Sequence, residues 1–167
     1  MKIPLKIEPA NGTAASPGGV EYRWDPDTEI LSAQLKQRPT GTGMSGSVEL
    51  EGADGSWLIL EVTAGRIHGV EIAVWPEVTK RNGLQPPAAV EDGDVSLPSR
   101  RSQPDVASME VETPVTAEAD DAERVFHFRL GRSRQTRTIR LAGDLLLDVD
   151  SANNLVGVWL LNVPPFR

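Results

Sequence analysis

The chain has 167 residues, enough for one domain of ordinary size or for two small ones that share a core. A formal net charge of -7 argues against nucleic-acid binding, and the absence of cysteine excludes disulfides, thiol nucleophiles and Cys-based zinc sites. Hydrophobic residues make up 39% of the chain and aromatic residues only 5%, so Val, Ile and Leu supply most of the core, a composition typical of β structure.

The N-terminal residues lack the apolar region of a secretory signal, and no run approaches the roughly 18 apolar residues of a membrane-spanning helix. The lack of cysteine also fits a reducing compartment. We therefore expect a cytoplasmic protein with neither a membrane nor a nucleic acid as its partner.

Alternating apolar and polar residues recur along the chain, whereas stripes at the helical period are hard to find. The first part of the chain predicts strands at residues 2–9, 30–35, 47–52, 57–62 and 67–75. Short segments with Gly, and in the first also Asp, lie at 53–56 and 63–66 and separate the last three strands. They are typical of hairpin turns, because these residues tolerate the positive φ that tight turns require.

The same series of patterns recurs toward the C-terminus, at residues 109–114, 125–130, 138–143 and 145–164. Matched positions keep nearly constant spacing: Leu35 with Leu130, Leu50 with Leu141, Leu60 with Leu147, Gly69 with Gly157 and Pro76 with Pro164. Because order, alternation and turn position agree, the sequence predicts an internal duplication. The alternative is that any two β-meanders look alike.

Residues 79–107 separate the two copies and are rich in Pro, Gly and charge, which predicts a linker or long loop, with a short edge strand at 95–98. The expected organisation is an N-terminal β repeat at 1–78, the linker at 79–107 and a C-terminal β repeat at 108–167. The two repeats share one core.

The expected fold is all-β, a duplicated antiparallel β-meander packed as a sandwich or a barrel-like body, because two copies can cover each other's apolar faces. The last strand, around Trp159, is apolar on both faces, which predicts a central strand packed on two sides. If the two halves do not cover both faces, a second subunit of a homodimer would. In the N-terminal counterpart Glu71 stands at the position of Trp159, so one face there is expected to be partly solvated.

Residues 22–35 and 55–76 combine an aromatic and acidic opening with a later Gly, an apolar residue, Glu and an aliphatic. In this pattern the chain resembles the family of small bacterial domains of unknown function numbered 2283, over residues 20–76 and more weakly over 122–164. The residues that carry the resemblance are Trp24, Asp25, Asp27, Ile30, Leu31, Leu35, Gly69, Val70, Glu71 and Ile72. The resemblance implies a small β-rich module and no catalytic residues.

Two acidic clusters are candidate cation or acid-base sites. Asp25 and Asp27 flank a proline, a pattern typical of a turn that begins a strand, but with His68 or His127 they could form a metal-dependent enzyme site. Residues 148–154 lack the oxygen ligand and the Gly that an EF-hand loop requires, so a hairpin turn is favoured there. No nucleophile elbow is present, since residues 43–47 miss that pattern by one place.

Basic residues concentrate between 128 and 141. If residues 131–137 form a hairpin loop, Arg132, Arg134 and Arg137 project together and can meet a phosphate, another anionic ligand or an acidic protein. The alternative is a solvated loop balanced by acidic neighbours. We therefore favour a non-catalytic binding or regulatory module for a protein or a small anionic ligand, with no cofactor and no metal, over a metal-dependent enzyme or a structural homo-oligomer. The expected binding residues are this arginine loop and the exposed part of residues 79–107.

Overall fold

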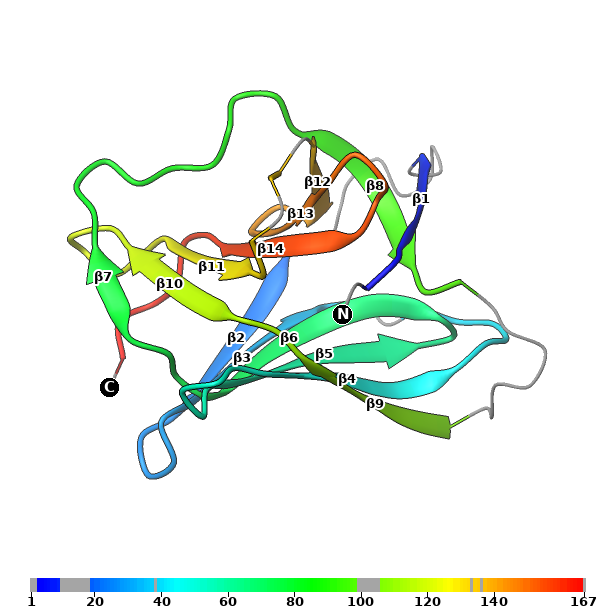
Figure 1. Ribbon diagram of the computed structural model, residues 1–167, viewed down its shortest axis with the longest axis horizontal. Coiled ribbons are helices and arrows are strands. Elements are labelled where there is room, and N and C mark those ends of the chain that lie inside the picture. The colour runs from blue at the N-terminus through cyan, green and yellow to red at the C-terminus, as the bar shows by residue number, and fades with distance from the viewer. Residues whose placement is uncertain are drawn as a thin grey trace.

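The computed structural model describes residues 3–9, 19–37, 39–98, 106–132, 134–135 and 137–166, and these residues form strands, turns and coil without any helix (Figure 1). No helix in this part of the chain is long and apolar enough to span a membrane. The expected all-β class is confirmed. The strands are β1 (Lys6–Pro9), β2 (Val20–Asp25), β3 (Ile30–Leu35), β4 (Ser45–Glu51), β5 (Trp57–Thr63), β6 (Arg66–Val74), β7 (Val78–Lys80), β8 (Glu91–Ser96), β9 (Val106–Glu112), β10 (Val115–Ala119), β11 (Phe126–Leu130), β12 (Arg137–Ala142), β13 (Leu145–Val149) and β14 (Leu155–Leu160).

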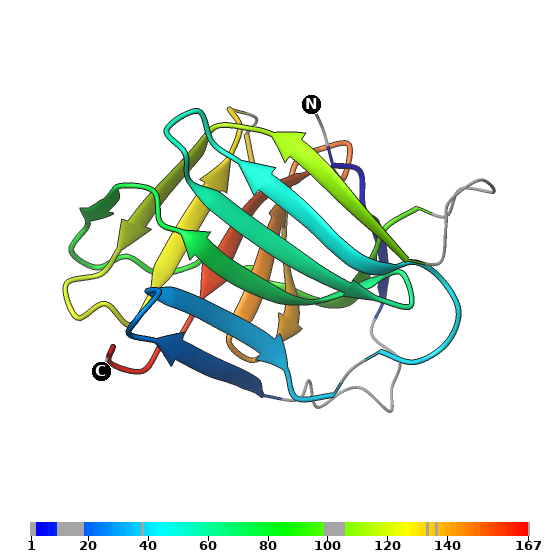
Figure 2. The ribbon, with the colours of Figure 1, turned by 90° about the horizontal axis from the view of Figure 1, so that it is seen from below.

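The strands form one mixed sheet in the order β7-β10-β11-β14-β13-β12-β8-β6-β5-β4-β9, with β1 beside β8 and with β2 and β3 beside β6. This sheet curls into a half-barrel, so that an N-terminal layer (β2 to β6 and β9) faces a C-terminal layer (β7 and β10 to β14) (Figures 1 and 2). Strand β8 joins the layers, because it pairs in parallel with β12 and meets the start of β6 through Arg66 and Ser96.

The core lies between the two layers and follows the alternation of the strands. In β5 every second residue is buried, and in β11 the buried residues alternate with His127 and Arg129 on the outer face. The largest fully buried side chains are Phe126, Phe128, Leu31, Leu50, Leu58, Leu60, Ile67, Ile72, Ile139, Leu145, Leu146 and Leu147. All six residues of β14 are buried, and this strand lies between β11 and β13, as expected for a central strand covered on both sides.

The two layers share one pairing order, which differs from a plain meander because the second strand of each layer pairs with the fifth. The N-terminal layer runs β2-β3-β6-β5-β4 and the C-terminal layer runs β10-β11-β14-β13-β12. In both, the register skips the residue before a glycine, His68 before Gly69 and Val156 before Gly157. An internal duplication predicts such agreement, and the common origin itself stays a prediction.

The segment expected as a linker contributes strands instead. It holds β8 and the end of β7, and β9 begins within it, while residues 99–105 lie outside the described part. The predicted edge strand at 95–98 overlaps β8, which is an interior strand with β1 on one side and β12 on the other. The acidic residues of β8 make its sequence unlike the apolar alternation of a strand. Close packing around β8 depends on Gly93, because a Cβ at this position would lie 3.1 Å from Ile139 Cγ2 and 3.0 Å from the Glu8 carbonyl oxygen.

Candidate functional site

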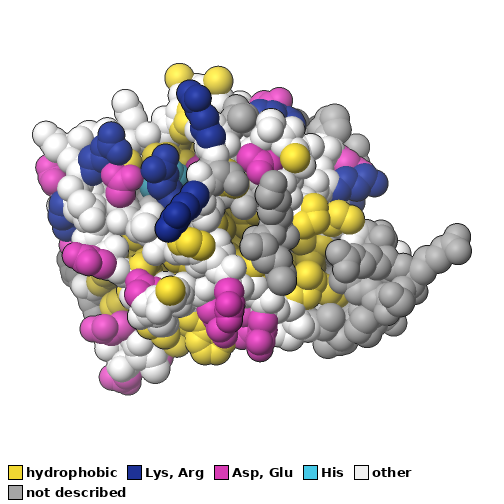
Figure 3. Space-filling model, viewed as in Figure 1, with side chains coloured by type: hydrophobic (Ala, Val, Ile, Leu, Met, Phe, Trp, Pro, Cys, Tyr) yellow, Lys and Arg dark blue, Asp and Glu magenta, His cyan; other side chains and the backbone are white. Residues whose placement is uncertain are grey.

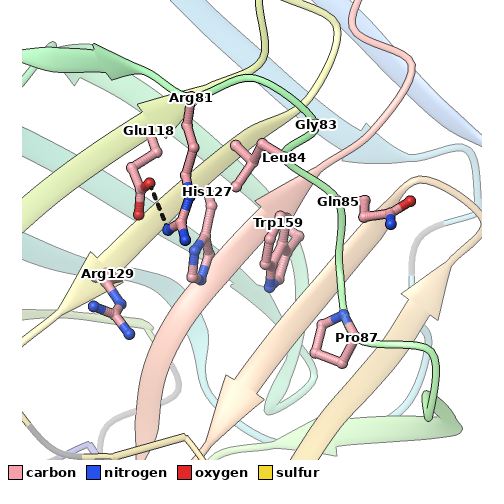
Figure 4. Close-up of a pocket in the computed structure, with 9 residues that line it drawn as sticks. All are labelled: Arg81, Gly83, Leu84, Gln85, Pro87, Glu118, His127, Arg129 and Trp159. Carbon is pink, nitrogen blue, oxygen red and sulfur yellow. Dashed lines mark hydrogen bonds and ion pairs between the residues drawn. The ribbon is translucent and has the colours of Figure 1, made fainter.

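A pocket of about 320 Å³ lies on the outer face of the C-terminal layer. Residues 81–90, which connect β7 to β8 and which we name the strap, run across this face (Figures 1 and 4). The pocket is lined by Arg81, Gly83, Leu84, Gln85, Pro87, Glu118, His127, Arg129 and Trp159. Five of these nine residues belong to the strap and four to the neighbouring strands β10, β11 and β14.

Strand pairing explains why these side chains meet. Glu118 of β10 pairs with His127 of β11, which pairs with Trp159 of β14, so the three form one row across the outer face. In the next row Arg129 pairs with Gly157, which pairs with Asp148 of β13. Figure 4 shows the side chains of the first row on the same side of the sheet, beneath the strap.

Asp148 is the centre of a buried polar network. Its side chain is 3% exposed and accepts hydrogen bonds from Thr138 Oγ1 at 2.8 Å and from Trp159 Nε1 at 3.1 Å. His127 Nε2 lies 2.8 Å from the Asp148 Oδ2 atom. Every oxygen of this carboxylate thus has a partner, as burial of a carboxylate requires.

The rings of His127 and Trp159 stack, with centroids 3.9 Å apart and an angle of 8° between the planes. The His127 side chain is 12% exposed, so one edge of the imidazole reaches the pocket while the other is held by Asp148. Both rings lose little freedom when a ligand binds, since stacking and hydrogen bonds already orient them.

Positive charge is in excess of negative charge at the pocket wall. Arg81 Nη1 lies 3.1 Å from Glu118 Oε2, which balances its charge. Arg129 is exposed, and among the described residues it has no ion-pair partner. Figure 3 shows Lys and Arg side chains gathered around a histidine on this face of the molecule. The pocket therefore carries an unbalanced guanidinium in a protein whose net charge is negative.

The strap is anchored where it leaves β7. The Arg81 amide donates to the Ala119 carbonyl oxygen at 2.8 Å, and the Leu84 amide closes a turn with the Arg81 carbonyl oxygen at 3.3 Å. Residues 85–89 run as coil or bend over the sheet, and Leu84 and Pro87 give the pocket an apolar rim. Trp159 on the outer face of β14 thus lies beneath the chain's own strap.

The three arginines predicted to bind an anion do not line this pocket. Arg132 and Arg134 are exposed in the loop between β11 and β12, of which residues 133 and 136 lie outside the described part. Arg137 begins β12 and lies 2.7 Å from Glu91 Oε2, so it ties β12 to β8. A binding role for the three arginines stays a prediction.

The acidic cluster near the N-terminus forms a turn, as expected. The Asp27 amide donates to Asp25 Oδ1 at 2.9 Å, and this hydrogen bond is the main cause of a lowered pKa at Asp25. Asp25 pairs with Ile30 at one end of β3, whereas Gly69, next to His68, pairs with the other end of β3. The two ends are four residues apart along the strand, a distance of about 13 Å. His127 belongs to the other layer, so the structure does not bring these carboxylates and histidines together.

Within the described ranges no group of three or more His, Asp or Glu side chains is placed to hold a metal ion. The second acidic cluster is a hairpin turn, as expected, since Asp150 Oδ1 accepts from the Ala152 and Asn154 amides at 2.9 Å. His68 is buried, with Nε2 at 2.8 Å from Thr63 Oγ1.

Sequence reasoning considered His127, Asp148 and Trp159 separately and missed their association. One signal was available: Asp148 interrupts the apolar run of β13, and a buried carboxylate needs donors from neighbouring strands. Arg81 and Glu118 carry no comparable signal.

Comparison with protein-family models and with curated proteins found no match for this chain.

Proposed function

We propose that the pocket under the strap binds a small organic molecule that carries an anionic group, and that the protein is a non-catalytic binding module. The observation that carries the proposal is Arg129, an exposed guanidinium without an ion-pair partner among the described residues, at the edge of a pocket with oriented rings. Arginine is well suited to carboxylates and phosphates, because its planar fork makes paired hydrogen bonds to them.

The size and lining of the pocket support a small ligand. A volume of about 320 Å³ is at the lower end of the range for small-molecule sites. Leu84, Pro87 and Trp159 offer apolar contact beside the charged group. None of the nine lining residues is Ser, Thr, Cys or Lys, so the wall supplies no hydroxyl, thiol or amine nucleophile. The two lining residues of other nucleophilic types, Glu118 and His127, are already paired with Arg81 and Asp148, which favours a binding role.

Titration with two isosteric probes tests this function. Phenylacetate and phenylacetamide have nearly the same shape and differ in charge, and binding is followed by backbone amide shifts in two-dimensional NMR. We expect phenylacetate to shift amides of β11, β14 and the strap, and phenylacetamide to shift them much less. Equal binding of the two probes, or shifts confined to another surface, would contradict the proposal.

A matched pair of variants locates the site. Arg129→Ser removes the pocket guanidinium and should weaken phenylacetate binding about tenfold, since a charged hydrogen bond contributes about 1.5 kcal/mol or more. Arg124→Ser removes an exposed arginine from the turn before β11, outside the pocket lining, and should leave the affinity unchanged.

We further propose a cytoplasmic location, supported by the lack of cysteine. A common origin of the two layers is supported by their shared pairing order. Membership of the family of domains of unknown function numbered 2283, and assembly into a homodimer, remain proposals from the sequence.

A further inference from the structure

The hydrogen bonds around Asp148 have a defined direction. Trp159 Nε1 can only donate, and Thr138 Oγ1, which accepts from Gln135 Nε2 at 3.1 Å, turns its own hydrogen toward Asp148. Two donors thus point at the Asp148 oxygens, the arrangement that suits an ionised carboxylate, which only accepts. His127 Nε2, 2.8 Å from its Oδ2, must then carry a hydrogen and donate it.

The other imidazole nitrogen of His127 is left for the pocket. Among the described residues Nδ1 has no hydrogen-bond partner, and it is not one of the fully buried polar atoms that lack one. When Nε2 holds the proton of a neutral imidazole, Nδ1 presents a lone pair and accepts a hydrogen bond. The charged groups around this ring are Asp148 on β13, Glu118 on β10, and Arg81 and Arg129 at the pocket wall.

We propose that Asp148 is a positioning residue that holds the His127 proton on Nε2, and that Nδ1 then accepts a hydrogen bond from the ligand. This inference rests on the proposed function, because it concerns the same pocket. Arg129 binds the anionic group and His127 Nδ1 binds a donor near it. The ligand class is therefore a small acid that also carries a hydroxyl or N–H group, such as a hydroxy acid.

The tautomer of His127 tests the first half of the proposal without any ligand. Long-range proton–nitrogen NMR spectra of the ¹⁵N-labelled full chain at pH 8.5, where histidine in water is neutral, distinguish the two tautomers. The chain has only two histidines, so a His68→Gln variant assigns the signals. We expect His127 to be the Nε2–H tautomer. The Nδ1–H tautomer would overturn the proposal.

Asp148→Asn provides the matched change, since the amide nitrogen of Asn can donate to Nε2 and so favours the Nδ1–H tautomer. A folded D148N protein whose His127 signals stay those of the Nε2–H tautomer would contradict a positioning role. If D148N does not fold, the spectrum of the unchanged chain still decides the tautomer.

Mandelate and phenylacetate test the ligand class, because they differ only by the α-hydroxyl group. We expect mandelate to bind about three- to tenfold more tightly, and His127→Gln to reduce this preference toward onefold. Equal affinities would overturn the ligand class and leave the anion-binding function standing. If neither acid binds, the proposed function is contradicted as well. The tautomer measurement would still test the role of Asp148.

Discussion

Asp148 and Gly157 face each other across β13 and β14, and the missing side chain of Gly157 is what gives the Asp148 carboxylate its place. A Cβ atom at position 157 would lie 2.5 Å from Asp148 Oδ2 and 3.2 Å from its Cγ. The carboxylate cannot simply move aside, because donors from β11, β12 and β14 hold it.

Gly157→Ala should therefore destabilise the protein by about 1–3 kcal/mol, as overpacking of a buried site does. Urea denaturation measures this loss of unfolding free energy. The control is Gly143→Ala, where a Cβ would meet no atom within 4 Å, and it should change stability by less than about 0.5 kcal/mol. Equal losses in both variants would show that the contact with Asp148 is not the cause.

Leu147→Ala and Leu160→Ala test the core between the layers. Both side chains are fully buried on the central strands β13 and β14, so each variant should lose about 2–5 kcal/mol of unfolding free energy. Val74→Ala, at a side chain that is 45% exposed, is the control and should cost less than about 0.5 kcal/mol. Losses under about 1 kcal/mol at the two leucines would contradict the assigned core.

The arginine loop separates binding from stability. Replacing Arg132 and Arg134 by Ser should leave the melting temperature nearly unchanged, because both side chains are exposed. The further change Arg137→Ser removes the ion pair with Glu91. Because the Arg137 and Glu91 side chains are 41% and 57% exposed, it should lower the free energy of unfolding by no more than about 1 kcal/mol. A large drop in melting temperature for the double variant would show that the loop is structural.

Glu71 should make stability depend on pH. Its pKa is raised, first by burial and second by the nearby Glu61 carboxylate. An ionised Glu71 therefore costs the folded state free energy above its raised pKa, and the cost disappears as the pH falls below the ordinary value of 4.5.

Glu71→Gln should then be more stable than the parent at pH 7, by less than about 1 kcal/mol because the group is half-buried, and the gain should vanish near pH 4. Thermal unfolding at both pH values measures it. Glu77→Gln, at an exposed position after β6, is the comparison. A gain that persists unchanged at pH 4 would mean that charge is not its origin.

The resemblance between the two halves was readable in the sequence because it lies in local patterns. Gly69 and Gly157, which the sequence comparison matched, each lie opposite a carboxylate in the structure. Gly69 pairs with Glu61, and Gly157 pairs with Asp148. The match of Glu71 with Trp159 also agrees with the structure, since Glu71 is partly exposed and Trp159 is buried.

Strands β2, β7 and β10 were missed in the sequence, and only the end of β8 was predicted. In β2 and β10 buried and outward residues do alternate, so a local signal was present and was missed. In β8 only Gly93 and Val95 are buried, and this strand depends on its pairing with β1 and β12. The order of strands also depends on long-range pairing, so the insertion of β6 beside β3 left no local signal.

The sequence by itself determined the all-β class and most of the strands, because alternation of apolar residues is a local property of a strand. Only the tertiary structure decided the pocket. Its side chains come from β10, β11 and β14, with Asp148 on β13, and a one-residue change of register would turn them to the opposite face. The strap, which begins at Arg81, follows β7 in the chain. The parallel pairing of β7 with β10 brings it beside these side chains, although the two strands lie about forty residues apart in the sequence.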